Sequence, residues 1–433
     1  MSIITEMLEQ VTLPKIVKIR QKFPAAELQD VAQTVREQLA KPEIAGRVKT
    51  GMRVAVAVGS RGMTDISLIA RVVVAELKRL GAQPFIVPAM GSHGGATAEG
   101  QSAVLAGLGV TAESAGCPIL SSMETVELGV IESSGLPVLI DKHAFEADGI
   151  VVINRIKGHN AFSGAVESGL SKMISIGLGK QKGADACHAF GFKHMAEQII
   201  AMAEIKLAKA NFLFGVGTVE NAYDRITRLV AVLPEDIIAT DKKLLPEAKA
   251  NLPKILFEHI DVLVVDQLGK EFSGGGMDVH TIGRSSTDYA RSAVASPERL
   301  VVLDVTDYSH GNCCGMGLAD LVTRRLFNKI DFEVTYANVL TSTGTRSGRI
   351  PLIMDSDRLA IQGAAKTCGV PDSKRLRLVR IPNSLHLEEI YISESMLPEA
   401  KACADIDILT QPREWTFDAA GNLNDIGFAK KEG

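Results

Sequence analysis

Short apolar segments alternate with amphipathic segments along the first part of the chain. Three apolar runs read as buried strands, and the segments between them place apolar residues at helical spacing. Thr97 stands where it would cap the second of these helices. The alternation predicts βαβ units and a mainly parallel sheet. The expected strands are 53–58, 83–88 and 149–153, and the expected helices are 67–80 and 97–108.

A second α/β unit begins near Ile260. Residues 260–266 and 300–305 read as buried strands, and 318–326 as a helix. The stretch 233–253 combines prolines with a helical piece and fits a hinge. We therefore predict two α/β domains with mainly parallel sheets and a cofactor cleft between them. They are an N-terminal cofactor-binding domain (1–255), a C-terminal substrate-capping domain (256–404), and a tail (405–433) that packs back on the first domain.

The composition is that of a globular protein. The chain has 433 residues, of which 46% are hydrophobic and 23% charged, enough for more than one core. The net charge of −4 gives no basis for a nucleic-acid partner or a membrane-surface patch. No apolar run reaches the roughly 18 residues of a spanning helix, and the first residues lack the apolar stretch of a secretory signal. The six cysteines form no CxxC pair, so we expect reduced thiols and a cytoplasmic location.

Several polar residues follow predicted strands. In parallel α/β sheets, ligands bind at the loops beyond the carboxyl ends of strands. Histidine is the usual general base near neutral pH, and arginine binds carboxylates or phosphates through two hydrogen bonds. An ordinary loop position remains an alternative for each of these residues. They are Arg61, His93, His159, Gln267 and Lys270.

The segment 155–192 is the richest in residues that carry chemistry. It combines glycines with His159, Lys172, Lys180 and His188. Glycines permit close backbone approach to a ligand, and their N–H groups can cradle a phosphate. A surface loop with solvated lysines and structural histidines explains the same composition equally well.

The loop 304–317 has the residue types of a metal site. Its spacing matches no zinc pattern, which favours a substrate-loop or packing role. The chain also lacks the dinucleotide fingerprint GxGxxG after its first strand, the phosphate-loop motif and HExxH, which disfavours an NAD dehydrogenase. The candidate ligands in the loop are Asp304, Asp307, His310, Cys313 and Cys314.

Four short blocks occur in order along the chain. They are Arg61 in a turn after the first strand of the sheet; Gly91-Ser92-His93 after the next strand; His159 followed by Ser163-Gly164, Lys172 and, sixteen positions later, His188; and the pair Gln267 and Lys270 at the start of the second domain. Together these blocks resemble the nickel-dependent lactate racemase family, which includes related 2-hydroxy acid racemases and epimerases.

The resemblance implies a nickel-pincer nucleotide as cofactor (pyridinium-3,5-bisthiocarboxylic acid mononucleotide nickel). It implies a covalent bond from this group to Lys172, nickel ligation by His188, and cofactor contacts from Ser60, Arg61 and Gly164. Imidazole and soft sulfur ligands suit Ni(II) in square-planar geometry. The enzymes that make such a cofactor are implied partners.

The resemblance also implies an activity. This is an isomerase, a racemase or epimerase that inverts C2 of a 2-hydroxy acid by reversible hydride transfer to the cofactor. His93 and His159 are the implied acid/base groups, one for each enantiomer. Gln267, Lys270 and Arg61 are the implied substrate-binding residues.

Three features differ from the family pattern, and all of them concern the substrate pocket. Gly94-Gly95 replace an arginine-proline pair, the stretch between His159 and Lys172 is longer, and the lone Trp415 lies in the tail. We therefore predict a 2-hydroxy acid larger than lactate. Candidates to bind an extended polar substrate are Arg346, Arg349, Asp307, Ser309 and Asn312.

Two other function classes are compatible with the same residues. One is a non-catalytic protein that binds a metallocofactor or a nucleotide. The other is a mononuclear metal hydrolase that uses His93, His159 and His188. The pattern leaves the oligomeric state and the particular 2-hydroxy acid open.

Overall fold

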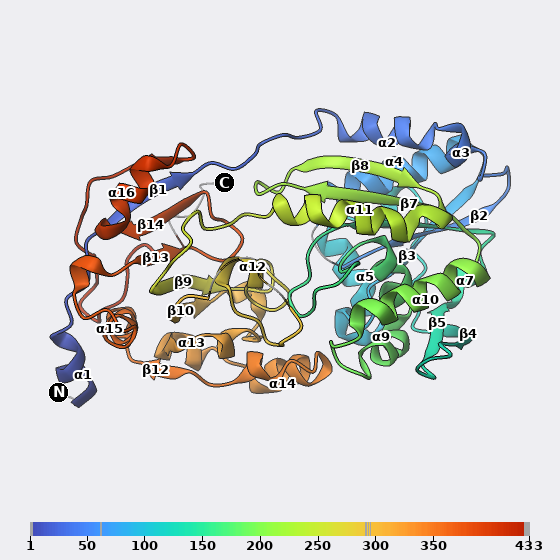
Figure 1. Ribbon diagram of the computed structural model, residues 1–433. Helices are drawn as coiled ribbons and strands as arrows, with labels where there is room; N and C mark the ends of the chain where they lie inside the picture. Colours follow the sequence, from blue (N-terminus) through green and yellow to red (C-terminus); the bar gives the residue numbers. More distant parts are fainter. Residues whose placement is uncertain (1–2, 61–62, 291, 293, 295, 428–433) are drawn as a thin grey trace. The chain divides into compact units, whose positions relative to one another are not determined.

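The computed structural model describes residues 3–60, 63–290, 292, 294 and 296–427. The chain divides into two compact units. The inserted unit is Ala25–Leu252, and the outer unit combines Met1–Pro24 with Pro253–Gly433. Each unit has its own sheet with parallel pairing and helices packed on it, so the predicted α/β class is confirmed (Figure 1). The predicted cleft between two domains stays a prediction.

The inserted unit has a five-stranded sheet of order β3-β2-β6-β7-β8, and a separate hairpin of β4 and β5. The first four strands are parallel and β8 is antiparallel to β7. Its strands are β2 (Arg53–Val58), β3 (Gln83–Pro88), β4 (Thr125–Val130), β5 (Pro137–Asp141), β6 (Gly149–Arg155), β7 (Phe212–Glu220) and β8 (Ile226–Val232). Its helices are α2 (Val31–Leu39), α3 (Pro42–Ala45), α4 (Ile66–Arg79), α5 (Ala98–Gly107), α6 (Ala112–Ala115), α7 (Lys142–Phe145), α8 (Leu170–Lys172), α9 (Lys180–His188), α10 (Met195–Lys209) and α11 (Ile237–Ala250).

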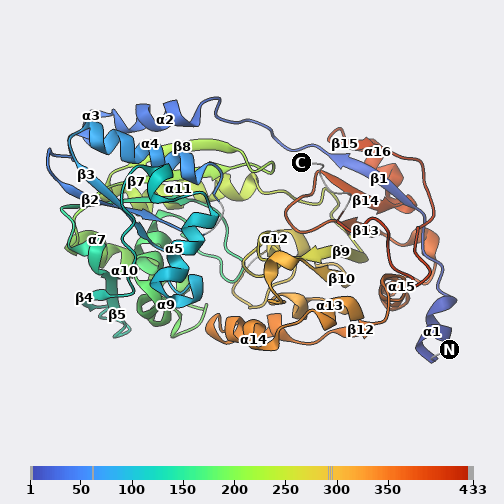
Figure 2. The ribbon, with the colours of Figure 1, turned by 180° about the vertical axis from the view of Figure 1, so that it is seen from behind.

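Both faces of this sheet are covered, as a parallel sheet requires. Strand β2 alternates valine and alanine: the valines pack with α2 and α4, and the alanines share a core with the segment that follows α8. Figures 1 and 2 show α2 and α4 on one side of the sheet and α9 and α10 on the other. The strands and helices predicted between residues 53 and 153 are confirmed to within a few residues, including Thr97 as the cap of α5.

The outer unit has an eight-stranded sheet of order β12-β11-β10-β9-β13-β14-β1-β15. The strands from β12 to β13 are parallel, and β14, β1 and β15 continue the sheet in antiparallel pairing. Its strands are β1 (Ile16–Gln21), β9 (Val262–Leu268), β10 (Arg299–Val305), β11 (Leu321–Thr323), β12 (Leu352–Met354), β13 (Leu378–Ile381), β14 (Glu389–Ser393) and β15 (Ile406–Ile408). Its helices are α1 (Ile3–Glu9), α12 (Val279–Ile282), α13 (Arg324–Asn328), α14 (Phe332–Thr341), α15 (Asp357–Thr367) and α16 (Leu397–Ala402).

The observed division of the chain differs from the predicted one at both ends. Residues 16–21, which we had assigned to the N-terminal domain, pair with β14 and β15 in the outer sheet. The tail from 405 also belongs to the outer unit: the indole of Trp415 donates a 2.9 Å hydrogen bond to the carbonyl of Pro14. Strand pairing across hundreds of residues depends on complementary sheet edges, which no local pattern reports.

The helix expected over 318–326 is also different. The structure has a short strand, β11, between Asp320 and Arg324, and α13 begins only at Arg324. Two apolar residues and a buried threonine, followed by a five-residue helix, fit a helical spacing, since both states bury the same side chains.

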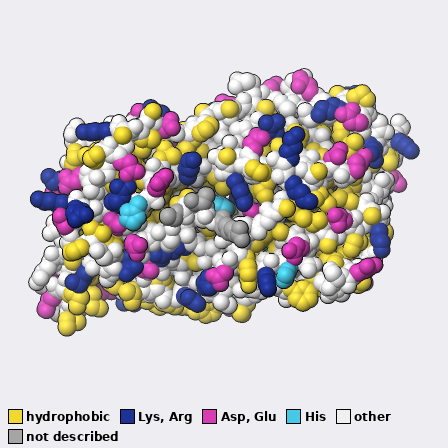
Figure 3. Space-filling view, viewed as in Figure 1, with side chains coloured by type: hydrophobic (Ala, Val, Ile, Leu, Met, Phe, Trp, Pro, Cys, Tyr) yellow, Lys and Arg dark blue, Asp and Glu magenta, His cyan; other side chains and the backbone are white. Residues whose placement is uncertain are grey.

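Lysine, arginine, aspartate and glutamate side chains are interspersed on the face of the molecule drawn in Figure 3. Among the described residues, no helix combines the length and the apolarity that crossing a bilayer requires.

Candidate active site

The predicted residues of the inserted unit lie at one edge of its sheet. Ser60 follows β2, His93 follows β3 and His159 follows β6, and these strands are neighbours with parallel pairing. Their loops therefore leave the sheet at the same carboxyl edge, where parallel sheets bind ligands. Arg61 lies outside the described residues.

The loop with Gly91 and His93 is packed tightly against the segment that carries Lys172 and His188. The Gly91 N–H donates to the carbonyl of Gly177 at 3.1 Å. A Cβ on Gly91 would stand 3.3 Å from the Cβ of Ala184, and the φ of Gly91 is +59°, so this close approach favours glycine. The hydroxyl of Ser60 shares a hydrogen bond with Nδ1 of His93. The predicted serine thus contacts one of the two predicted acid/base groups.

A buried polar network supports this loop from below. The side chain of Gln101 donates to the carbonyls of Gly91 and His93, and its oxygen accepts a 3.0 Å hydrogen bond from Lys180. Lys180 also forms an ion pair with Asp141 at 3.1 Å, and both side chains are fully buried. Burial lowers the pKa of Lys180, and the Asp141 carboxylate opposes that effect. The interpretation of 155–192 as a loop with solvated lysines is therefore wrong for Lys180.

Lys172 is the last residue of the short helix α8 and is followed directly by a π-helix, Met173–Gly177. The carboxylate of Asp241, on α11, accepts hydrogen bonds from the N–H groups of Leu170 and Ser171 at 3.1 and 2.7 Å, and so caps the start of α8. A Cβ on Gly169 would stand 2.5 Å from that carboxylate, so only glycine fits there. Short π-helical turns occur frequently at functional sites.

Lys206 supports the π-helix from α10. Its side chain is fully buried, and its amine donates to the carbonyls of Ile174 and Ser175 at 2.9 and 2.6 Å. Burial lowers the pKa of Lys206 to about 7. The amine satisfies carbonyls that a π-helical turn leaves without their usual partners.

This lysine predicts a pH dependence of stability. In the unfolded chain the lysine pKa is about 10.4, so above pH 7 the unfolded state binds more protons and stability rises with pH by at most about 1.4 kcal/mol per pH unit. Below about pH 7 both states are protonated and the contribution is flat. We expect Lys206→Met to lose this rise in urea-unfolding midpoints between pH 7 and 9, while the exposed control Lys182→Met keeps it. Equal slopes for the Lys206 variant and the wild type would contradict the burial of a titrating amine.

Glu167 organises the loop that carries His159. One carboxylate oxygen accepts the N–H of His159 at 2.7 Å, and the other accepts the N–H of Gly164 at 3.1 Å and pairs with Lys249 at 2.5 Å. A Cβ on Gly164 would stand 2.3 Å from the Cβ of Ala196, on α10. Gly164 therefore also packs this loop against α10, and its predicted contact with the cofactor stays a prediction.

Two phenylalanines bring three of the predicted residues together. Phe162 and Phe192 stack with centroids 6.3 Å apart, and the ring of His159 lies 4.5 Å from Phe162 and 6.2 Å from Phe192. The amine of Lys172 lies 6.0 Å from the centre of Phe162, and His188 meets Phe192 edge-on at 5.8 Å. One aromatic cluster therefore contacts His159, Lys172 and His188.

The hydrogen bonding of His188 suits a metal ligand. Its Nδ1 lies 2.7 Å from the carbonyl of Ala184, and because a carbonyl only accepts, Nδ1 carries the proton and Nε2 presents its lone pair. Burial lowers the pKa of His188, the nearby charge of Lys172 lowers it further, and the Ala184 carbonyl and Asp185 oppose the change. A neutral imidazole with a fixed tautomer is the form that ligates a metal.

Gln267 and Lys270 lie in the outer unit, at and just beyond the carboxyl end of β9. The N–H of Lys270 donates to the hydroxyl of Ser309 at 3.0 Å. The Lys270 amine donates to the carbonyl of Gly274 at 2.9 Å and to the side chain of Asn338. The position of this lysine is therefore set by its loop.

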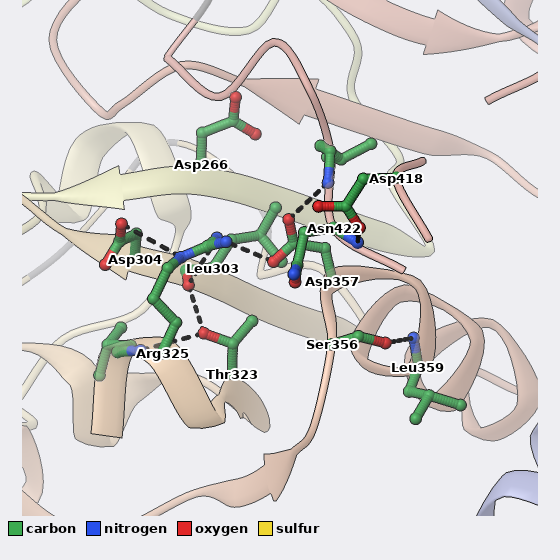
Figure 4. Close-up of polar contacts among 12 residues, drawn as sticks. Asp266, Leu303, Asp304, Thr323, Arg325, Ser356, Asp357, Leu359, Asp418 and Asn422 are labelled. Atoms are coloured by element: carbon green, nitrogen blue, oxygen red, sulfur yellow. Dashed lines mark hydrogen bonds and ion pairs between the residues drawn. The ribbon is translucent and has the colours of Figure 1, made fainter. Parts of the chain in front are cut away.

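The loop 304–317 contributes to a charged network of the outer unit. Asp304 pairs with Arg325 at 3.2 Å, and Arg325 donates to Asp357 at 2.9 Å (Figure 4). Asp304 also pairs with Lys329 at 3.1 Å. Among the residues that the structure describes, no group of three or more His, Cys, Asp and Glu side chains is arranged to hold a metal ion. Arg346, a candidate for substrate binding, forms two hydrogen bonds with the exposed Asp288.

Several residues that shape the site were not predicted. Glu167 and Asp241 are ordinary polar residues in the sequence, and only distant backbone N–H groups reveal their role. Lys206 did have a local signal. It occupies the apolar stripe of α10, in register with Ile199, Met202 and Ala203. A lysine on such a stripe indicates a buried amine with an assigned partner.

The fold and the site define an α/β protein with histidines and one lysine gathered at the carboxyl edge of a parallel sheet. A family model described as the lactate racemase N-terminal domain matches residues 5–199 of the chain. The lactate racemase apoprotein from Thermoanaerobacterium thermosaccharolyticum has a solved structure that is 13% identical, with a TM-score of 0.49, covering 84% of this chain and 99% of its own. No curated protein matches the chain.

Proposed function

We propose that this protein is a racemase or epimerase that inverts C2 of a 2-hydroxy acid larger than lactate. The observation that supports this proposal most is the aromatic cluster of Phe162 and Phe192, which contacts His159, Lys172 and His188. The match of residues 5–199 to the model of the lactate racemase N-terminal domain supports it independently. No specific observation favours the two alternatives, a non-catalytic protein that binds a metallocofactor or nucleotide and a mononuclear metal hydrolase.

We propose Lys172 as the covalent tether and His188 as the nickel ligand of a nickel-pincer nucleotide. The residues present fit that group, since His188 is held as a neutral donor and Lys172 reaches the same aromatic cluster. When bound, the cofactor supplies a reversible hydride acceptor for the hydrogen at C2. Ser60, Arg61 and Gly164 remain proposed cofactor contacts, and Arg61 is also a proposed substrate contact. Enzymes that synthesise the cofactor remain proposed partners.

The two histidines exchange the hydroxyl proton. Nδ1 of His159 accepts the N–H of Ala161 at 3.1 Å, and we therefore assign proton exchange at His159 to its Nε2. Nδ1 of His93 is engaged by Ser60, and we assign proton exchange to its Nε2. One histidine removes the hydroxyl proton as C2 loses its hydrogen, and the other protonates the oxygen when the hydrogen returns to the opposite face of the planar 2-keto acid.

The proposed preference for a larger substrate rests on the loop after His93. Gly94 packs against the start of α5, where a Cβ would stand 2.6 Å from the backbone of Gly100, but a Cβ on Gly95 would meet nothing within 4 Å. The open position is thus at Gly95, two residues after His93, and we propose that a larger substrate uses this room. We propose Gln267 and Lys270 as substrate-binding residues that address the polar groups of such a substrate.

We expect hydrogen at C2 to be retained during turnover. The protein, expressed with the enzymes that make the cofactor, would be supplied with single enantiomers of 2-hydroxy acids carrying deuterium at C2, from lactate to sugar acids. Both enantiomers should keep the label, because hydride transfer does not exchange with water, and an extended acid should exceed lactate in kcat/KM. Label lost to water would contradict hydride transfer, and lactate as the best substrate would contradict the size argument. A cofactor adduct without turnover would indicate the non-catalytic alternative.

A further inference from the structure

The C-terminal segment 422–427 is held in the outer unit by buried carboxylates. The N–H of Leu423 donates to Asp357 at 2.8 Å, and the N–H of Gly427 donates to Asp266 at 2.8 Å. Both aspartates are fully buried. Figure 4 shows Asp357 accepting a hydrogen bond from the chain next to Asn422. Hydrogen bonds to buried carboxylates are among the strong ones, so both points of the segment are firmly placed. We call residues 422–427 the C-terminal latch.

Arg380 ties the middle of the latch to the sheet. Its guanidinium makes two 2.8 Å hydrogen bonds with Asp266, donates to the backbone carbonyl of Asp425 at 3.0 Å, and pairs with the Asp425 carboxylate at 3.0 Å. The Arg380 side chain is 1% exposed. A buried arginine with its donors so occupied fixes the direction of the latch as well as its position.

The latch crosses the carboxyl end of β9. Asp266 and Gln267 are consecutive residues of that strand, so their side chains point to opposite faces of the sheet. Gly427 lies close to both: its N–H bonds to Asp266, and a Cβ built on it would stand 2.9 Å from the side-chain oxygen of Gln267. Its φ of +72° is also a conformation that favours glycine. The glycine therefore allows the latch to lie directly against the Gln267 carboxamide.

We propose that the C-terminal latch is a specificity element of the substrate site, in which Gly427 is a positioning residue that holds the Gln267 carboxamide toward the polar groups of the 2-hydroxy acid. This inference rests on the proposed function, because it takes Gln267 as a substrate-binding residue. It adds to the proposed function that residues 422–427 form one wall of the substrate site. The latch acts through Gln267 and takes no part in proton or hydride transfer.

The chain offers a matched pair of variants for the test. Gly427 and Gly421 both have positive φ, +72° and +84°, and a Cβ on either would stand 2.9 Å from a side-chain oxygen, of Gln267 and of Ser356 respectively. Gly427→Ala and Gly421→Ala therefore introduce the same backbone strain and a similar steric conflict. Only the first displaces the Gln267 carboxamide.

We expect Gly427→Ala to raise the KM of the preferred 2-hydroxy acid roughly 3- to 10-fold at nearly unchanged kcat, the range expected for a misplaced neutral hydrogen bond. Gly421→Ala should lower the melting temperature similarly but leave KM within about twofold. Asp425→Asn, which weakens the pairing with Arg380 and leaves Gln267 untouched, should raise KM by a smaller factor. This second variant decides the question if Gly427→Ala fails to fold.

A second readout needs no activity. In protein labelled with ¹⁵N-glutamine, the side-chain amide signal of Gln267, assigned by its loss in Gln267→Ala, should shift in Gly427→Ala and stay in Gly421→Ala. An unmoved amide signal overturns the contact, and a moved signal with unchanged KM overturns the specificity role. If the wild-type holoenzyme turns over no 2-hydroxy acid, the proposed function is overturned instead. In that case a shifted amide signal still shows that Gly427 lies next to Gln267, but not that this affects a substrate.

Discussion

Lys172→Ala protein, expressed together with the enzymes that make the cofactor, is expected to show the mass of the unmodified chain and no racemisation. Lys172 ends α8, where Asp241 caps the helix and the π-helix follows, and its amine lies 6.0 Å from the ring of Phe162. A tethered cofactor requires this amine, so its removal abolishes both the adduct and turnover. Intact-protein mass spectrometry and a chiral assay on the same sample measure the two effects.

The matched control for this experiment is Lys182→Ala. Lys182 is exposed on α9, in the same segment, and its removal changes charge without touching the site. His188→Ala should keep the adduct but lose nickel, measured by metal analysis, because the Nε2 donor is gone while the tether remains. Full activity in Lys172→Ala would refute the racemase proposal.

His93→Ala and His159→Ala are each expected to lose about 100- to 10,000-fold in kcat, the usual contribution of a positioned general acid or base. Both directions of racemisation should fall together, because each turnover uses one histidine as base and the other as acid. His93 is oriented by Ser60, and His159 by the Ala161 N–H and the two phenylalanines. Initial rates from each pure enantiomer measure the two directions separately.

His194→Ala is the control for the histidine series. His194 is in the inserted unit, pairs with Glu197 at 2.9 Å and is about half exposed, so its loss should leave the rates near those of the wild type. If either His93→Ala or His159→Ala racemises at a near-normal rate, that histidine does not exchange the proton. A loss in one direction alone would show that the two histidines do not share each turnover.

The strands that carry the site were predictable because parallel strands covered on both faces are continuous apolar runs. Residues 53–58, 83–88 and 149–153 have that pattern, and glycines or polar residues follow each of them. The histidines His93 and His159 could therefore be assigned to one edge of a sheet. Segments of three to five residues, such as β11 and α13, are too short to show a period, and there the prediction was wrong.

The sequence by itself determined the α/β class, the positions of the main strands along the chain and the spacing of Lys172 from His188, because these depend on residues near one another in the chain. Only the tertiary structure decided that residues 16–21 join the outer sheet, that Lys180 and Lys206 are buried amines, and that Gly427 lies against Gln267. Each of these depends on a partner far away in sequence. Burial and hydrogen-bond partners become defined only when the distant segments pack, and the same lysine is a solvated charge or a buried donor according to what surrounds it.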